Sequence, residues 1–137
     1  YDEEMLRKSA QQVCEFPGPY GFTPRFALKA LPTKAILQLF HSVGLHFDAS
    51  SGFEIQRAVL AGIPASKISL SSQELPDSPD LLKTGARFNA CSLKQLKWFG
   101  EHFRGETVGI RFNPGQGSGG HIKTNVGGKS SAFGIWY

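Results

Sequence analysis

The chain has 137 residues, 40% of them hydrophobic, which suits one domain with a packed core. Its 15 basic and 11 acidic side chains give a net charge of +4, and Lys and Arg are scattered, which argues against a nucleic-acid-binding face. No apolar run would cross a membrane and no leader-like segment opens the chain, so we expect a cytoplasmic protein without a membrane partner. Cys14 and Cys91 fit no disulfide framework or metal motif, and we expect two reduced thiols.

Helix-like and strand-like segments alternate along the chain. The first, residues 2–16, is expected to be an amphipathic helix with Met5, Leu6, Ala10 and Val13 facing inward. Five apolar or β-branched runs then recur at intervals of about 20 residues, at 25–28, 45–47, 67–70, 87–90 and 108–112.

Between these runs, residues 35–40, 55–60 and 93–99 have helical periodicity. Helix starts are expected at Ser50 or Ser51, within residues 77–79, and at Ser92. Helix ends are expected at four glycines, Gly44, Gly62, Gly85 and Gly100.

Strand and helix alternating at a fixed period predict βα units and a parallel sheet. A doubly wound sheet and a barrel both satisfy this pattern, and the uniform period favours the barrel. A complete barrel needs eight units and about 250 residues. We therefore predict an α/β fold for residues 1–137: one incomplete domain forming a partial (β/α)8 TIM-type barrel of about five βα units.

Lys29 follows the first strand-like run, in Phe26-Ala27-Leu28-Lys29-Ala30. A lysine among apolar residues is costly to bury unless it has a task, and burial favours the neutral amine that forms imines. Barrels also place their active sites at the carboxyl ends of the strands. The alternative is a solvated lysine at a strand end.

Two carboxylates and an arginine are expected near the same edge. Asp48 closes the second strand-like run, beside Lys29 on the adjacent strand, and Glu54 lies about one helical turn further on. Such carboxylates can hold a lysine's charge or orient a cofactor, although Asp48 could instead cap the following helix. Arg111 ends the fifth run and suits a phosphate or carboxylate, with a rim salt bridge as its alternative.

The stretch Gly115-Gln116-Gly117-Ser118-Gly119-Gly120 formally contains G-x-G-x-x-G, but no helix start follows it. A dinucleotide site needs that helix, so an active-site loop is the better interpretation. His121 could act as a base or ligand, but it has no partner at metal-binding spacing, and we predict no metal site.

Five stretches in register resemble the ornithine/diaminopimelate/arginine decarboxylases, pyridoxal-phosphate enzymes of fold type III, and in particular their N-terminal barrel portion. The diaminopimelate decarboxylase branch is the most similar, because Asn-Pro follows Arg111 and because of the spacing from His121 to Phe133. The stretches are residues 26–32, 47–54, 61–64, 110–115 and 133–135.

The resemblance implies a cofactor, pyridoxal 5'-phosphate, and roles at four positions. Lys29 matches the lysine that forms the Schiff base, Asp48 and Glu54 match carboxylates beside that lysine and the cofactor, and Arg111 matches an arginine near the ring. It further implies an amino-acid substrate, lysine biosynthesis as the pathway, and a cytoplasmic homodimer as the parent enzyme.

The sequence also departs from the family. Ala132 stands where a lysine usually precedes the Phe-Gly-Ile. The ring-stacking histidine, the glycine-rich phosphate loop, the glutamate facing the pyridine nitrogen and the C-terminal β-domain do not occur in these residues. We therefore expect this chain alone to be inactive and to bind the cofactor weakly.

Three alternatives remain. The substrate could be ornithine, arginine or carboxynorspermidine rather than diaminopimelate. The chain could belong to alanine racemases or small cofactor-carrier proteins, which share the barrel and a strand-end lysine. A non-catalytic module that acts by protein association is the third, since half a barrel leaves an open sheet edge.

Overall fold

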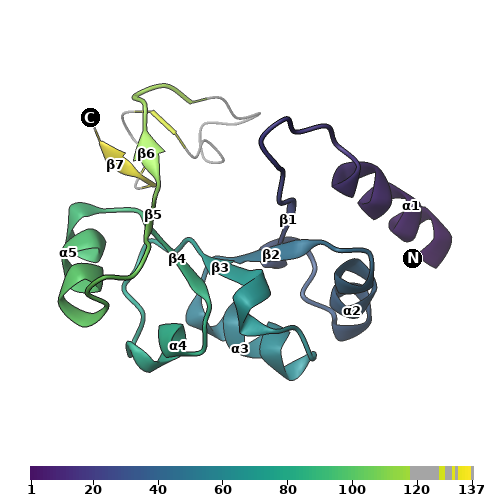
Figure 1. Cartoon of the computed structure of the whole chain (residues 1–137), viewed down its shortest axis with the longest axis horizontal. Helices are drawn as coiled ribbons and strands as arrows, with labels where there is room; N and C mark the ends of the chain where they lie inside the picture. Colours follow the sequence, from purple (N-terminus) through teal and green to yellow (C-terminus); the bar gives the residue numbers. More distant parts are fainter. Residues whose placement is uncertain (118–126, 129–130, 132, 137) are drawn as a thin grey trace.

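A five-stranded parallel sheet organises this computed structural model, which describes residues 1–117, 127–128, 131 and 133–136. The strands pair in chain order, each parallel to the next (Figure 1). A doubly wound sheet would reverse its strand order, so the sequential order confirms the barrel-type prediction. The strands are β1 (Arg25–Ala27), β2 (His46–Ala49), β3 (Ile68–Leu70), β4 (Arg87–Ala90) and β5 (Gly109–Ile110).

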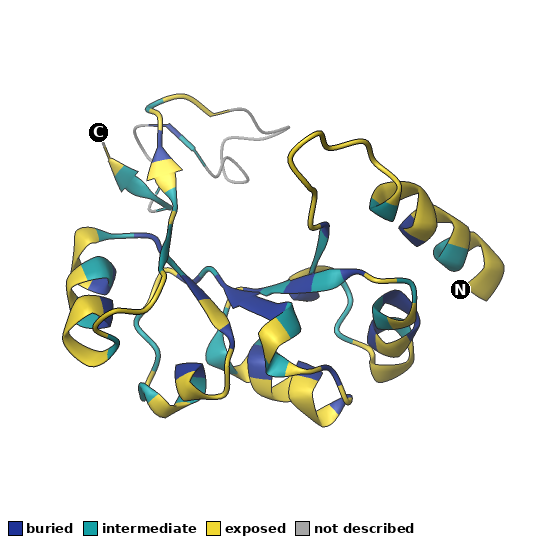
Figure 2. Cartoon of the chain, viewed as in Figure 1, coloured by how far each residue is buried: buried dark blue, intermediate teal, exposed yellow. Residues whose placement is uncertain are grey.

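A helix follows each of the first four strands, and these four helices lie on one side of the sheet (Figure 1). The core lies between the helices and the strands, and Figure 2 shows the buried residues concentrated there. Phe47, Ile68 and Phe88 are at most 2% exposed and form its centre. The helices are α1 (Glu3–Cys14), α2 (Lys34–Ser42), α3 (Gly52–Leu60), α4 (Asp80–Lys83) and α5 (Leu93–His102), with 3-10 turns η1 (Leu28–Ala30) and η2 (Ala65–Lys67).

Alternation along each strand divides its side chains between two faces. In β2, Phe47 and Ala49 are buried toward the helices, whereas His46 and Asp48 lie on the opposite face, which we call the inner face. The same alternation puts polar residues on the inner face of β3 and β4. This face is the part of the fold where the candidate site lies.

The helix boundaries follow local capping chemistry. The Ser51 hydroxyl accepts a hydrogen bond from the Glu54 amide at 3.3 Å, and Ser92 caps α5 in the same way, as predicted. Gly44, Gly62 and Gly85 have φ near +95° and end α2, α3 and α4, also as predicted. These left-handed conformations favour glycine because it has no Cβ.

The prediction that a helix ends at Gly100 is wrong. Helix α5 continues to His102, and the left-handed glycine is Gly105, with φ +85°. A single exposed glycine costs a helix only about 1 kcal/mol, so it does not by itself end one.

Helix α1 is also narrower in its buried face than predicted. Ala10 is buried and Leu6 partly so, but Met5 and Val13 are 69% and 47% exposed. The reason is that α1 packs mainly on α2 within the described residues, so a narrow stripe of its surface is covered.

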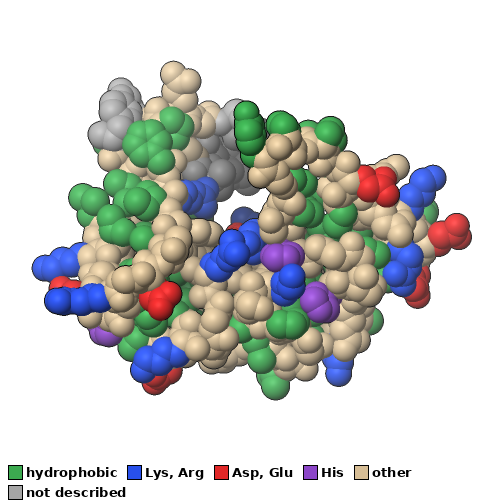
Figure 3. Space-filling model, viewed as in Figure 1, with side chains coloured by type: hydrophobic (Ala, Val, Ile, Leu, Met, Phe, Trp, Pro, Cys, Tyr) green, Lys and Arg blue, Asp and Glu red, His purple; other side chains and the backbone are tan. Residues whose placement is uncertain are grey.

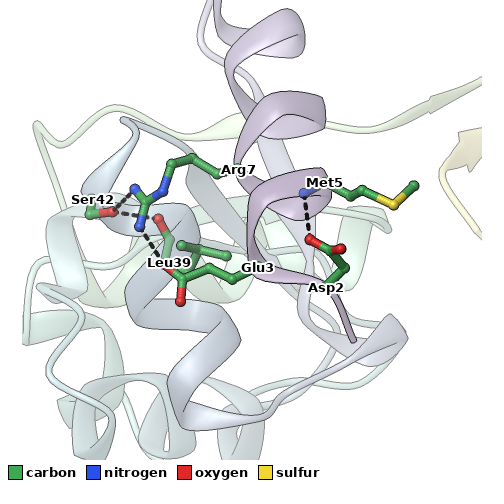
Figure 4. Close-up of polar contacts among 6 residues, drawn as sticks. All are labelled: Asp2, Glu3, Met5, Arg7, Leu39 and Ser42. Atoms are coloured by element: carbon green, nitrogen blue, oxygen red, sulfur yellow. Dashed lines mark hydrogen bonds and ion pairs between the residues drawn. The ribbon is translucent and has the colours of Figure 1, made fainter.

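Polar contacts cap the start of α1 and connect α1 to α2 (Figure 4). Asp2 accepts from the Met5 amide at 3.1 Å, which caps the helix. Arg7 bonds Glu3 within α1 at 2.8 Å and reaches Ser42 on α2 at 3.3 Å. Because these contacts are exposed, they set the orientation of α1 on α2 and add little to the stability of the fold.

Beyond β5, two short strands, β6 (Phe112–Asn113) and β7 (Ile135–Trp136), pair in parallel (Figure 1). Most of the chain between them, with His121, Ala132 and residues 118–120 of the glycine-rich stretch, lies outside the described residues. No helix in the described part of the chain is long and apolar enough to span a membrane.

Candidate functional site

Lys29 lies at the carboxyl edge of the sheet, just past the end of β1. The strand ends at Ala27, and Lys29 is the middle residue of η1. Its side chain is exposed, so the expectation of a buried lysine is wrong: the adjacent Leu28 takes the buried place, with 0% exposure. Lys29 can therefore meet a ligand arriving from solvent.

Asp48 belongs to the strand next to Lys29 and is paired in register with Ala27. One of its carboxylate oxygens, Oδ1, accepts hydrogen bonds from the Ser69 hydroxyl at 2.6 Å and the Ser71 hydroxyl at 3.0 Å. Neither bond is a helix cap, so the capping alternative for Asp48 is wrong. The two hydroxyls, both from the β3 segment, fix the direction of the carboxylate.

The chain of hydrogen bonds continues across the sheet. Asn89 on β4 donates from Nδ2 to the Ser71 oxygen at 2.9 Å, so the Ser71 proton is left to donate to Asp48. Gly109 on β5 makes room for this, because a Cβ there would collide with the Asn89 side chain. We call Asp48, Ser69, Ser71 and Asn89 the Asp48 network.

Glu54 has a local role at the start of α3. Its carboxylate accepts from the Ser50 amide at 2.7 Å and contacts the Ser50 hydroxyl at 3.1 Å, while its own amide bonds Ser51. This is a reciprocal cap of the kind that stabilises helix starts. The capping function considered for Asp48 thus belongs to Glu54 and Ser51.

Arg111 follows β5 at the same edge. Its guanidinium carbon lies 4.5 Å from the centre of the Phe133 ring, a cation–π arrangement that orients the side chain. The buried thiol of Cys91 lies within reach of two of these charges: burial raises its pKa, Arg111 lowers it, and Asp48 raises it. Arg111 and Asp48 therefore share one electrostatic environment.

Asn113 ties the end of β6 to Gly128, five residues before Phe133. It is 2% exposed; its Nδ2 donates to the Gly128 carbonyl and its Oδ1 accepts from the Gly128 amide, both at 3.1 Å. The Gly115 amide adds a third bond at 3.1 Å. This pairing, which we call the Asn113 clamp, joins the two ends of the 114–127 segment.

A cavity of about 640 Å³ opens beside this edge. It lies between residues 50–53 at the start of α3 and residues 70–78 after β3, and Phe133 forms part of its wall. Lys29, Asp48 and Arg111 do not line it, so we regard it as a neighbour of the candidate site that touches the site through Ser71.

Gln95 supports one wall of this cavity and was missed by sequence reasoning. It is 1% exposed and donates to the carbonyls of Ser72 and Glu74, both at 3.0 Å, while its Oε1 accepts from the Cys91 amide at 2.6 Å. The sequence feature that could have revealed Gln95 is a polar residue within the otherwise apolar stripe of α5.

The fold and the site define a class of protein: a (β/α) barrel-type domain with a lysine, an oriented aspartate and an arginine at the carboxyl edge of its strands. Residues 3–137 match the family model described as the pyridoxal binding domain of pyridoxal-dependent decarboxylases, and the chain belongs to this family.

Individual relatives agree with that assignment. The chain is 36% identical over 140 residues to a diaminopimelate decarboxylase of Buchnera aphidicola. The match covers 99% of this chain and 32% of the relative. It is 37% identical to the Streptomyces coelicolor enzyme, over 100% of this chain and 31% of the relative. The chain thus spans about a third of the length of these relatives.

Solved structures agree as well. The Helicobacter pylori diaminopimelate decarboxylase, complexed with L-lysine, superposes with a TM-score of 0.79 at 27% identity, covering 99% of this chain and 36% of that one. The M. jannaschii enzyme, also with L-lysine, gives 0.72 at 26% identity over 98% and 34%. The prediction of the N-terminal part of a fold type III barrel is therefore confirmed.

The residues at the carboxyl edge fit the family's cofactor, pyridoxal phosphate. The exposed Lys29 amine can bond to an aldehyde, and the Arg111 guanidinium suits an anionic group. Asp48, on the strand between those that carry Lys29 and Ser69, is already oriented by two hydroxyls. The donor set is thus chemically appropriate for this cofactor.

Proposed function

We propose that this chain is the cofactor-binding part of a pyridoxal-phosphate-dependent amino-acid decarboxylase of the diaminopimelate decarboxylase type, and that Lys29 is its attachment point. The observation that carries the proposal is that an exposed lysine just after β1 and the oriented Asp48 on β2 belong to neighbouring strands, with Ala27 and Asp48 in register. Both belong to the edge where barrels perform their chemistry.

Bound pyridoxal phosphate supplies an electron sink that lets an amino acid lose its carboxylate as CO₂. The chain's own residues prepare the site for it. The amine of Lys29 would hold the cofactor in place and, when free, would hold or deliver a proton near the reacting atoms. Asp48 stays directed at the site because Ser69 and Ser71 donate to it.

Arg111 and Glu54 complete the proposed set. Arg111, held over Phe133, presents a planar cation that suits the cofactor's charged groups or the substrate carboxylate. Glu54 keeps the loop between β2 and α3 fixed through Ser50, which supports the edge next to Asp48. Glu54 is therefore proposed as a residue that positions the edge.

The rest of the proposal concerns the longer enzyme. Because the matched relatives are about three times as long, we expect the 137 residues alone to bind the cofactor weakly and to release no CO₂. We propose a cytoplasmic homodimer that acts on diaminopimelate in lysine biosynthesis. An assay of CO₂ release from diaminopimelate, ornithine and arginine by the longer enzyme identifies the substrate.

Lys29 is tested directly by trapping. The chain is incubated with pyridoxal phosphate, reduced with borohydride and mapped by peptide mass spectrometry. We expect the label on Lys29, its loss in Lys29→Arg, and its retention in the control Lys34→Arg, which changes an exposed lysine at the start of α2. A label spread evenly over surface lysines would contradict the proposal.

A further inference from the structure

The Ser71 hydroxyl lies at the centre of the Asp48 network and can donate only one hydrogen bond. Its oxygen is 3.0 Å from Oδ1 of Asp48 and 2.9 Å from Nδ2 of Asn89. Because the amide nitrogen of Asn89 can only donate, the Ser71 oxygen accepts there and its single proton goes to Asp48. The direction of the Ser71 bond is thus decided on β4, two strands away from Asp48.

The orientation of the Asn89 amide determines this direction. Nδ2 faces Ser71, whereas the amide oxygen faces Gly109 on β5, where an added Cβ would collide with it. If the oxygen faced Ser71 instead, it would accept the Ser71 proton and take it from Asp48. An aspartate has the shape of asparagine but no donor, so the shape of residue 89 can be kept while its hydrogen-bonding function is reversed.

Both hydroxyls of the network donate to the same oxygen of Asp48. The Ser69 hydroxyl lies 2.6 Å from Oδ1 and 3.4 Å from the Phe47 carbonyl, and the shorter bond takes its proton. Oδ1 therefore has two donors, while Oδ2 accepts no hydrogen bond from the described residues. Since Asp48 is only partly buried, Oδ2 is the oxygen that a ligand can reach.

Acceptors of this kind are scarce on the inner face. Asp48 is the only acidic residue in the described strands. In Figure 3, Lys and Arg side chains (blue) gather in the middle of the face shown, whereas most Asp and Glu side chains (red) lie at its rim. Burial and Arg87 lower the pKa of Arg25 and Asp48 raises it, so Asp48 lies within electrostatic reach of Arg25. A carboxylate with fewer donors would turn toward such a cation.

We propose that Asn89 is a positioning residue for the chemistry of Lys29: through Ser71, it keeps Asp48 with one oxygen occupied and the other available to the reacting nitrogen. This inference rests on the proposed function, attachment of the cofactor at Lys29. When an amine nitrogen bonds to an aldehyde carbon, water leaves, and the nitrogen of the product is positively charged when it holds a proton. Lys29 follows β1, where Ala27 pairs with Asp48, so an oriented Oδ2 can stabilise that charge.

The test is a double-mutant cycle on the labelling of Lys29. The 137-residue chain is incubated with increasing pyridoxal phosphate and reduced with borohydride, and the label on Lys29 is quantified by peptide mass spectrometry. Asn89→Asp offers Ser71 an acceptor and so withdraws its proton from Asp48. We expect the half-saturating cofactor concentration to rise about tenfold, which corresponds to one hydrogen bond to a charged group.

Variants of Ser71 separate the relay from other effects. Ser71→Ala should cause a similar loss, and in that background Asn89→Asp should change labelling by less than about twofold, because the connection to Asp48 is already absent. Additive losses would show that the new charge acts directly and would overturn the proposal. Ser71→Thr keeps the hydroxyl and should label within about twofold of the wild type. A loss equal to that of Ser71→Ala would assign the effect to packing.

Two controls make the result specific. Gln12→Glu adds the same negative charge at an exposed position of α1 and should label like the wild type. An equal loss in Gln12→Glu and Asn89→Asp would show a general charge effect and refute the role of Asn89. Urea unfolding of each variant shows that labelling is compared between folded chains, and the Ser71 variants test the relay even if Asn89→Asp does not fold.

A measurement without cofactor tests the relay by itself. In a ¹H–¹⁵N spectrum of the chain, the side-chain NH₂ signals of Asn89 should shift in Asp48→Asn, which removes the charge at the other end of the relay. They should stay in place in Glu101→Gln, which neutralises an exposed carboxylate on α5. Unshifted signals in Asp48→Asn would refute the connection.

Failure of this inference differs from failure of the proposed function. A wild-type chain that takes no label on Lys29 would refute cofactor attachment there. A wild-type chain labelled on Lys29, together with unchanged labelling in Asn89→Asp and Ser71→Ala, would refute the positioning role of Asn89 and leave the attachment point standing.

Discussion

Substituting Gly109 tests whether the Asp48 network is a packed unit. An added Cβ at this position would collide with the Asn89 amide, whose Cγ would lie 3.1 Å away. Asn89 would have to leave its 2.9 Å hydrogen bond to Ser71, and the strand pairing of Asn89 with Gly109 would be strained. Ser71 would then lose the partner that directs its proton to Asp48.

The expected magnitude combines two effects. The lost hydrogen bond destabilises the fold by about 1 kcal/mol, and forcing a methyl group into a filled site adds about 1–3 kcal/mol. We therefore expect Gly109→Ala to lower the free energy of unfolding by about 2–4 kcal/mol. Urea unfolding followed by the fluorescence of Trp98 and Trp136 measures it.

Two comparisons make the result specific. Gly100→Ala is the control, because Gly100 is exposed within α5 with nothing near its Cβ position; it should stabilise by about 0.5–1 kcal/mol. In an Asn89→Ala background the collision disappears, so most of the cost of Gly109→Ala should disappear with it. An unchanged cost in that background would refute the proposed contact.

Three further predictions follow from other contacts. Gln95→Leu should destabilise by about 2–3 kcal/mol in urea unfolding, because it removes the hydrogen bonds of the Cys91 amide and the Ser72 carbonyl, while the Glu74 carbonyl keeps its bond from the Ser72 hydroxyl. Gln56→Leu, at an exposed position of α3, should change stability by less than about 0.5 kcal/mol. The pKa of His46 is lowered in the folded chain, mainly by burial, so below about pH 6.5 the unfolded chain binds a proton before the folded chain does, and stability falls as pH falls. In His46→Gln, the urea midpoint should fall less between about pH 8 and pH 5 than in the wild type. An unchanged pH dependence would exclude His46 as its source. Asn113→Ala should speed hydrogen exchange of the Gly128 amide at least about tenfold, since it removes that amide's partner, and unchanged exchange would show that the clamp is not formed.

The strand pattern was predictable because it depends on burial alone. Side chains such as Phe47 in β2 and Phe88 in β4 belong to the core between the strands and the helices, so apolar runs recur at the period of the fold. The ends of α2, α3 and α4 were predictable for a local reason, the left-handed glycines. Gly100 shows the limit, since a glycine marks a helix end only where the backbone takes that conformation.

Helix faces were harder to predict. The helical periodicity of residues 55–60 groups Val59 and Leu60 with Ile55 on one apolar face, but they are 44% and 83% exposed, whereas Ile55 and Ala58 are buried. Close approach of a helix to a sheet favours a small side chain at the contact, and hydrophobicity does not reveal that. The sequence pattern therefore placed the buried face of α3 about one residue away from its position in the structure.

The candidate site also contains residues that the sequence could locate and residues that it could not. Lys29, Asp48 and Arg111 could be placed at one edge of the sheet because each lies near or just past the carboxyl end of a strand, which the period alone locates. Ser71 and Asn89 were missed, because their bonds depend on the register between neighbouring strands, and two sequence patterns separated by a helix do not contain that register.

The two ends of the inner face differ in how far these residues satisfy one another. At the carboxyl edge, Asp48 has two hydroxyl donors and Arg111 lies against Phe133, so the groups are oriented within the described chain. At the amino end, the Nδ1 donor of His46 has no acceptor there. It follows that cofactor attachment at Lys29 should survive substitution of His46, because the hydrogen bonds that orient Asp48 do not involve His46. The two ends of the inner face would then act independently of each other.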